Sequence, residues 1–129
     1  MKFLSVVARI SCAYDLAIGI VMLAATDTFA AVFHVPPPTP VLFGKLLGIF
    51  AIAVGLGYLA PARDPRTHRH YLWIFGPGLK GAGAVAFIAD HLMNASPVSF
   101  LLFAASDGTL ALVTWWGLRR LSQESAGRP

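Results

Sequence analysis

Three ionisable residues, Asp15, Lys80 and Asp107, each stand near the middle of a long apolar stretch of the sequence. A charge at the centre of a bilayer costs at least about 2.5–3.5 kcal/mol, so it needs a partner, a water-filled cavity or a function. Counted from the ends of their apolar stretches, all three lie about 14 Å deep at the helical rise of 1.5 Å per residue. We therefore expect them to share one layer of a helix bundle, with the two carboxylates flanking Lys80. Such a layer can bind a ligand, relay protons or simply fix helix register.

A second polar set lies nearer the predicted outer face. Lys45 is about one turn inside the second apolar stretch, and Asp90 and His91 lie near the end of the third. His91 follows Lys80 by about three helical turns, so the two share a face. This spacing predicts a polar column from the outer surface to the midplane, lined by His91, Lys45 and Lys80. Lys45 and Asp90 can pair there, or each can extend towards the interface.

The third apolar stretch contains Gly76-Pro77-Gly78, one turn before Lys80. Proline has no amide hydrogen, so Pro77 leaves the carbonyl of Trp73 without its usual donor. The sequence therefore predicts a helix break here. Broken helices near the midplane often form substrate or ion sites, although a plain kink is the other interpretation.

Several kinds of chemistry find no support in the sequence. The histidines have no acidic or cysteine set beside them that would complete a zinc site, and no two inward-facing histidines lie at the matching depth that a haem needs. No Ser-His-Asp or Cys-His set is in helical register. We therefore predict no metal and no cofactor, and the catalytic residues, if any exist, are unknown. The net charge of +4 comes from basic clusters between apolar runs, which leaves no soluble surface for a nucleic-acid partner.

The elements that must position these residues are membrane helices. Hydrophobic residues make up 57% of the chain and charged residues 12%, against about 25% charged in soluble domains. Four apolar stretches, at about 3–25, 41–60, 71–93 and 98–118, each match the roughly 20 residues that a helix needs to span a bilayer. Short loops rich in proline separate them. The sequence predicts an all-α integral membrane up-down four-helix bundle in one domain, residues 1–121, followed by a polar cytoplasmic tail, 122–129.

The basic residues predict the orientation of these helices. Lys and Arg occur before or at the start of the first stretch, in the second loop and after the fourth stretch, and the first and third loops contain neither. The positive-inside rule then places both chain ends in the cytoplasm. A cleaved signal peptide is the alternative for the first stretch, but its length and the central Asp15 favour a retained helix.

The stretch 55–65, GLGYLAPARDP, is followed by Lys80 in the third apolar segment. This pattern resembles the uncharacterised small four-helix bacterial membrane proteins grouped around the DoxX-like family. The resemblance covers the second and third helices, and it implies a four-helix bundle in a bacterial inner (cytoplasmic) membrane, crossing it several times. It carries over no catalytic residue.

Three functions remain open at this stage. The preferred hypothesis is a protein that binds or moves a small or amphipathic molecule, or protons, at a buried polar site formed by Asp15, Lys80 and Asp107. The second is a non-catalytic accessory subunit that assembles with itself or with a larger membrane complex through small residues such as Gly44 and Gly48, although these glycines could equally pack inside the bundle. The third is an enzyme acting on a lipid-soluble substrate, in which the same layer supplies acid–base groups.

Overall fold

The computed structural model describes residues 2–128, and every regular element in that range is helical. In chain order the elements are α1 (Lys2–Ala24), α2 (Thr26–Val32), α3 (Val41–Gly57), α4 (Leu59–Arg63), α5 (Arg69–Trp73), the π-helix η1 (Ile74–Lys80), α6 (Gly81–Asn94) and α7 (Phe100–Ala126). They form four candidate membrane spans, Lys2–Ala24, Val41–Arg63, Arg69–Asn94 and Phe100–Ala126, which confirms the all-α bundle with four spans. Met1 and Pro129, the outermost residues of the predicted domain and tail, lie outside the described residues.

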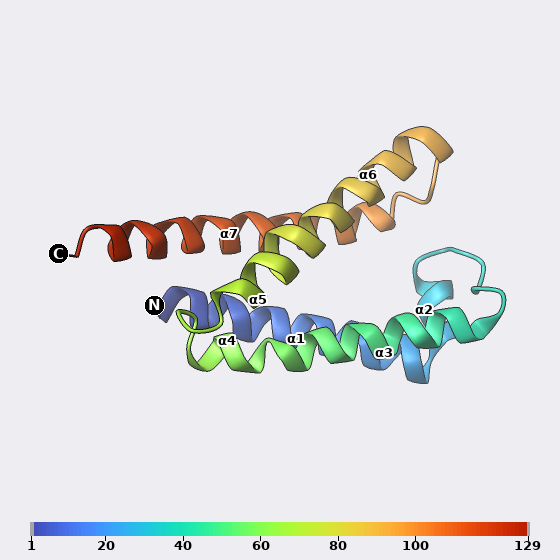
Figure 1. Ribbon diagram of the computed structural model, residues 1–129. Helices are drawn as coiled ribbons and strands as arrows, with labels where there is room; N and C mark the ends of the chain where they lie inside the picture. Colours follow the sequence, from blue (N-terminus) through green and yellow to red (C-terminus); the bar gives the residue numbers. More distant parts are fainter. Residues whose placement is uncertain (1, 129) are drawn as a thin grey trace.

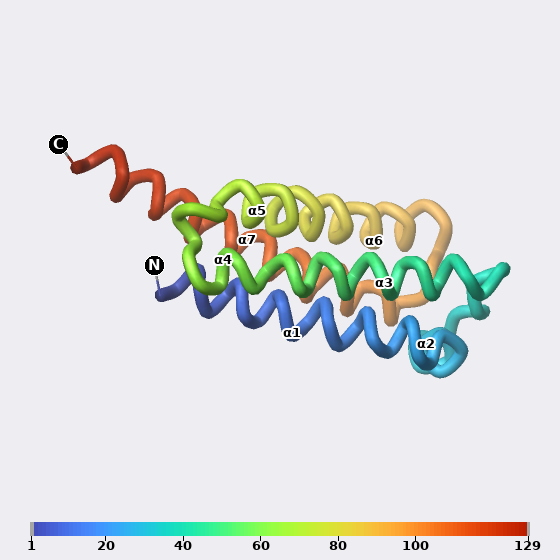
Figure 2. The backbone as a smooth tube through the Cα atoms, turned by 60° about the horizontal axis from the view of Figure 1, so that its bottom comes forward, coloured from blue at the N-terminus to red at the C-terminus, as the bar shows by residue number. Residues whose placement is uncertain are grey.

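The four spans are arranged as two helix pairs (Figure 1). α1 packs along α3, and α6 packs along α7. Both described ends of the chain and the α4–α5 connection lie at one end of the molecule, whereas α2 and the α6–α7 turn lie at the other (Figure 2). The pairs meet towards the first end, through contacts of α1 with α7, and diverge towards α2 (Figure 1).

Glycines bring the first helix pair into backbone contact. A Cβ atom added to Gly48 would lie 2.8 Å from both the carbonyl oxygen of Gly19 and the amide nitrogen of Leu23. Gly44, Gly48 and Gly55 are buried on the same helix. Small residues allow such close approach where lipid supplies no hydrophobic drive. Of the two interpretations that the sequence left open, these glycines therefore serve packing inside the bundle.

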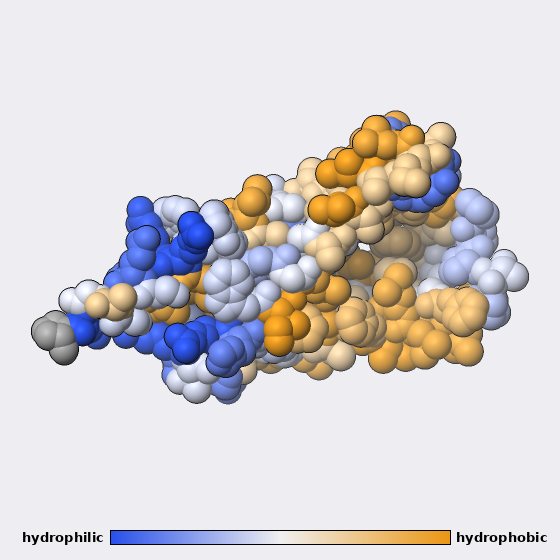
Figure 3. Space-filling model, turned by 45° about the horizontal axis from the view of Figure 1, so that its top comes forward, coloured by the Kyte–Doolittle hydropathy of each residue, from blue (hydrophilic) through white to orange (hydrophobic). Residues whose placement is uncertain are grey.

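The two pairs share one compact core at the end where they meet. Its largest fully buried side chains include Leu4, Tyr58, Leu72 and Leu118. The hydroxyl of Tyr71 donates a hydrogen bond to the carbonyl of Val54 and ties the third span to the second. Large apolar side chains cover much of the outer surface instead of polar ones (Figure 3). A surface of this kind suits a hydrocarbon solvent.

The short helix α2 was not predicted from the sequence. Its seven residues are too few to show a helical period, and they precede a run of prolines. In the structure, tertiary contacts of its aromatic rings hold it in place: the ring centroids of Phe29 and Phe33 lie 5.9 and 4.6 Å from that of Phe103. α2 therefore lies over the diverging end of the bundle.

The last helix continues beyond the apolar stretch that ends at Leu118 and reaches Ala126. Hydropathy identifies only the part of a helix that suits lipid. Most residues after Leu118 are polar, but they include good helix formers such as Arg, Leu, Gln and Glu. Arg119 and Arg120 lie over the rings of Trp115 and Trp116, at 4.6 and 4.0 Å from the ring centroids. These cation–π contacts place the basic groups at the edge of the apolar surface.

The loop before α5 has one acidic turn with a testable pH dependence. The carboxylate of Asp64 accepts hydrogen bonds from the Thr67 hydroxyl at 2.6 Å and from the amides of Arg66 and Thr67. These bonds favour the charged form, so the pKa of Asp64 is lowered from its ordinary value of 3.8. The support that Asp64 gives this turn is therefore complete above that value and is lost as the pH falls through the lowered pKa.

We expect an NMR titration of the Arg66 and Thr67 amide protons to show a midpoint below 3.8, because these protons report the ionisation of Asp64. In the Thr67→Val variant the midpoint should rise, since the hydroxyl bond to Asp64 is then missing. A midpoint at or above the ordinary value in the unmodified protein would contradict the described turn.

Candidate functional site

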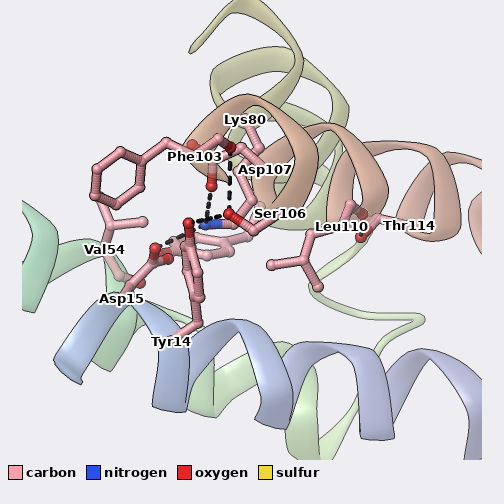
Figure 4. Close-up of polar contacts among 10 residues, drawn as sticks. Tyr14, Asp15, Val54, Lys80, Phe103, Ser106, Asp107, Leu110 and Thr114 are labelled. Atoms are coloured by element: carbon pink, nitrogen blue, oxygen red, sulfur yellow. Dashed lines mark hydrogen bonds and ion pairs between the residues drawn. The ribbon is translucent and has the colours of Figure 1, made fainter. Parts of the chain in front are cut away.

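The structure brings Asp15, Lys80 and Asp107 together, as the sequence analysis predicted (Figure 4). Asp15 comes from α1, Lys80 from the last position of η1, and Asp107 from α7. The Lys80 Nζ atom donates a hydrogen bond of 2.7 Å to Asp15 Oδ1 and lies 3.9 Å from Asp107 Oδ1. Lys80 is 4% exposed and Asp15 is 8% exposed. Three helices are thus joined by one buried salt-bridge cluster.

Two tyrosine rings complete the surroundings of the lysine. The Nζ atom lies 5.1 Å from the ring centroid of Tyr14 and 5.7 Å from that of Tyr58. The Tyr14 hydroxyl is 2.6 Å from Ser106 Oγ. Because Ser106 directs its single hydrogen to backbone carbonyls of its own helix, Tyr14 is the donor of this bond. The lysine therefore occupies a site made of two carboxylates and two aromatic faces.

Tyr14, Tyr58 and Ser106 were not predicted from the sequence. A signal for two of them was available, because each buried aspartate follows a hydroxyl-bearing residue, in Tyr14-Asp15 and Ser106-Asp107. Nothing in the sequence pattern indicates Tyr58, which lies between α3 and α4 and is fully buried.

At the predicted break, Gly76-Pro77-Gly78, the chain forms the π-helix η1. In a π-helix each carbonyl accepts from the amide five residues on. The carbonyl of Trp73, which Pro77 leaves without a donor, then meets the amide of Gly78. The wider turn also rotates the residues that follow, and Gly76 is close to α7, where an added Cβ would lie 2.7 Å from Thr114 Cγ2. Lys80 thereby faces α1 from the end of η1.

A cavity of about 310 Å³ opens beside the cluster, between the diverging helix pairs. Asp15, Lys80 and Asp107 lie at its polar end. Four phenylalanines, from α2, α6 and α7, contribute to its walls: Phe29, Phe87, Phe100 and Phe103. Figure 3 shows a hollow on this side of the molecule, framed by apolar side chains.

One polar atom at this end of the cavity has no partner. Asp15 Oδ2 is buried and makes no hydrogen bond, whereas Oδ1 of the same carboxylate binds Lys80. Buried acceptors are nearly always satisfied, so an unsatisfied one needs an explanation. With both carboxylates ionised, the cluster also carries one negative charge in excess. Asp15, which lines the cavity, therefore holds a buried acceptor without a partner.

The second polar set is not brought together. Lys45 and Asp90 are both exposed, and within residues 2–128 no ion pair joins them. Asp90 instead accepts a hydrogen bond of 2.6 Å from Asn94, one turn later on α6. His91 Nδ1 lies 2.7 Å from the carbonyl oxygen of Ser96 in the following turn. Local contacts at the end of α6 therefore hold Asp90 and His91, and neither residue lines the cavity.

The described part of the chain holds no group of three His, Cys, Asp or Glu side chains arranged to bind a metal ion. Cys12 is a buried, free cysteine in the core.

The fold and the cluster define a class of protein: a multi-pass α-helical membrane protein with a buried Asp–Lys–Asp salt-bridge cluster beside a lateral cavity. No protein-family model, no curated protein and no solved structure matches the chain. Its function therefore has to be argued from this site.

Proposed function

We propose that this protein binds a small amphipathic molecule in the cavity, with the polar group of the ligand at Asp15, Lys80 and Asp107. The observation that carries the proposal is an aromatic-walled cavity lined at one end by the buried cluster of Asp15, Lys80 and Asp107, in which Asp15 Oδ2 has no hydrogen-bond partner. Ligand sites are mostly apolar clefts with a few placed polar groups. The cavity volume of about 310 Å³ lies at the small end of their range of roughly 300–1,000 Å³.

The shape of the bundle supports entry of the ligand from the bilayer. α3 and α6 diverge where the cavity lies, so the opening faces the side of the bundle (Figure 1). Leu47 and Leu79 line the cavity and are exposed and apolar. A lipid-soluble molecule can reach the cavity along this surface without crossing water. The same acid–base groups would serve an enzyme acting on such a molecule, with binding as its first step.

The distribution of basic residues supports a proposal about how the protein is oriented in the membrane. The basic residues near both chain ends and in the α4–α5 connection lie at one end of the bundle, and on the positive-inside rule we propose that this end is cytoplasmic. Residues 1–121 would then form the membrane domain and 122–129 a cytoplasmic tail. We keep the DoxX-like resemblance of residues 55–65 and a bacterial inner membrane as proposals.

Gly44 and Gly48 contact α1 and the loop before α3, so an accessory subunit would have to assemble through its lipid-facing side chains.

Photolabelling tests the proposed binding. The probe is 4-(trifluoromethyldiazirinyl)benzyl alcohol, an amphipathic molecule with one ring, applied to the protein in lipid nanodiscs. We expect saturable labelling at Phe87, Phe100 or Phe103, displaced by excess benzyl alcohol and mapped by mass spectrometry. Labelling at a lipid-facing residue such as Val85, which is 67% exposed, should not saturate.

Gly83→Leu should abolish the saturable labelling because its side chain would occupy the cavity. Gly83 lines the cavity, and an added Cβ would meet only Asp107 Oδ2, at an ordinary 3.7 Å. Ala86→Leu is the matched control, since Ala86 is exposed on the same helix and should leave labelling unchanged. Labelling at the phenylalanines that does not saturate, or that is equal in both variants, would refute binding in this cavity.

A further inference from the structure

The charges at the polar end of the cavity indicate which head group it accepts. Asp15 and Asp107 supply two carboxylates, and Lys80 is the one ammonium between them. An anionic head group would add to the excess negative charge in a medium of low dielectric, where like charges repel strongly. A cationic head group would remove that excess. The same attraction would also supply the unsatisfied Asp15 Oδ2 atom with a partner.

The titratable groups that face the two carboxylates do not neutralise the excess negative charge of the cluster. They come from α1, from the α3–α4 junction, from α5 and from η1, and the titratable ones are Cys12, Tyr14, Tyr58, Tyr71 and Lys80. Only Lys80 among them is cationic at neutral pH. Hydrocarbon supplies no counter-ion, so in the empty cavity one proton on the carboxylate pair is the available compensation.

Lys80 itself shows that the site stabilises an ammonium group. Its Nζ atom is held by Asp15 and lies within 6 Å of the Tyr14 and Tyr58 ring centroids. Beyond the lysine, the cavity also has a carboxylate and aromatic rings in its walls. The side chain of Asp107 is 18% exposed, more than that of Asp15, and the rings of Phe87 and Phe103 stack at 5.5 Å on the cavity wall. Aromatic faces next to a carboxylate are the usual surroundings of bound organic cations.

We propose that the ligand of this cavity is a monovalent organic cation with an apolar body, and that its binding releases one proton from the Asp15–Asp107 pair to water. The inference rests on the proposed function and specifies its ligand class. The cationic group lies against Asp107, the more exposed of the two carboxylates, and the apolar body lies among the phenylalanines. No covalent bond changes: one positive charge enters the site and one proton leaves it. Affinity therefore rises with pH until the pair is fully ionised.

The test compares three competitors of similar size against the benzyl alcohol photoprobe in nanodiscs: benzyltrimethylammonium, benzyl alcohol and phenylacetate. We expect the cation to displace the probe at a concentration at least tenfold below that of benzyl alcohol, and phenylacetate to be the weakest. Binding of the cation in weak buffer should release about one proton per protein, measured with a pH-indicator dye.

Asp107→Asn should remove the advantage of the cation over benzyl alcohol, so that the two displace the probe at similar concentrations, and it should remove the proton release. Asp90→Asn, which removes an exposed carboxylate outside the cavity, is the matched control and should change neither. Equal potency of the cation and the alcohol, or a stronger anion, overturns this inference and leaves the proposed function standing. Failure of all three competitors overturns both.

Discussion

Replacing Lys80 with methionine is expected to lower the free energy of unfolding by about 3 kcal/mol, because it leaves Asp15 and Asp107 facing each other without a cation. Breaking a buried ion pair from one side costs roughly 3–5 kcal/mol. The lower end applies here, since the two carboxylates can take up protons instead of staying charged. Methionine matches the length of the lysine stem, so the loss reports charge more than packing.

The measurement is unfolding in mixed micelles with increasing sodium dodecyl sulfate, followed by circular dichroism. Lys45→Met is the control: it removes an exposed lysine and should change the free energy by less than about 0.5 kcal/mol. A double-mutant cycle with Asp15→Asn isolates the pair, and the double variant should be more stable than the sum of the single losses implies. Additive losses would show that Lys80 and Asp15 do not act as a pair.

The sequence can predict those features of the site that depend only on how deep in the membrane each residue is expected to lie. Asp15, Lys80 and Asp107 stand at about the same distance from the nearer ends of their apolar stretches, and in a bundle of antiparallel helices equal depth places side chains in one layer. The cost of an isolated charge in lipid then forces opposite charges in that layer to meet. The expected depth and the charge of a residue both follow from its position and type in the chain. For this reason the cluster agrees with the prediction.

Rotation about a helix axis and divergence between helices were not predictable in this way. Asp90 and Lys45 lie at a depth where water or the interface can solvate them, so no large energy forces them to pair, and Asp90 bonds to Asn94 on its own helix. The cavity depends on how α3 and α6 separate, which no single stretch of sequence encodes. η1 changes the helical register around Pro77, so the rotation of Lys80 relative to the residues before Pro77 cannot be counted at a constant 3.6 residues per turn.

The backbone contact between α1 and α3 gives the second large effect: Gly48→Leu is expected to destabilise the protein by about 3 kcal/mol, the upper end of the typical range for overpacking. An added Cβ already lies 2.8 Å from two backbone atoms of α1, the Gly19 oxygen and the Leu23 nitrogen. A backbone in a helix cannot rotate away as a side chain can, so α1 and α3 would have to separate along the contact. The rest of the leucine side chain adds to this overlap.

The same unfolding measurement can test the contact with a graded pair of glycines. Gly48→Ala should already be destabilising, whereas Gly81→Ala should be neutral or stabilising by up to about 1 kcal/mol, because alanine favours helix over glycine and its Cβ would meet Ala111 at 3.9 Å. The two substitutions add the same methyl group to two helices, so opposite signs can only come from the neighbours. If Gly48→Ala were also neutral, α1 and α3 would be farther apart than described. A dimer contact at Gly48 would instead make the loss depend on protein concentration, which a dilution series excludes or reveals.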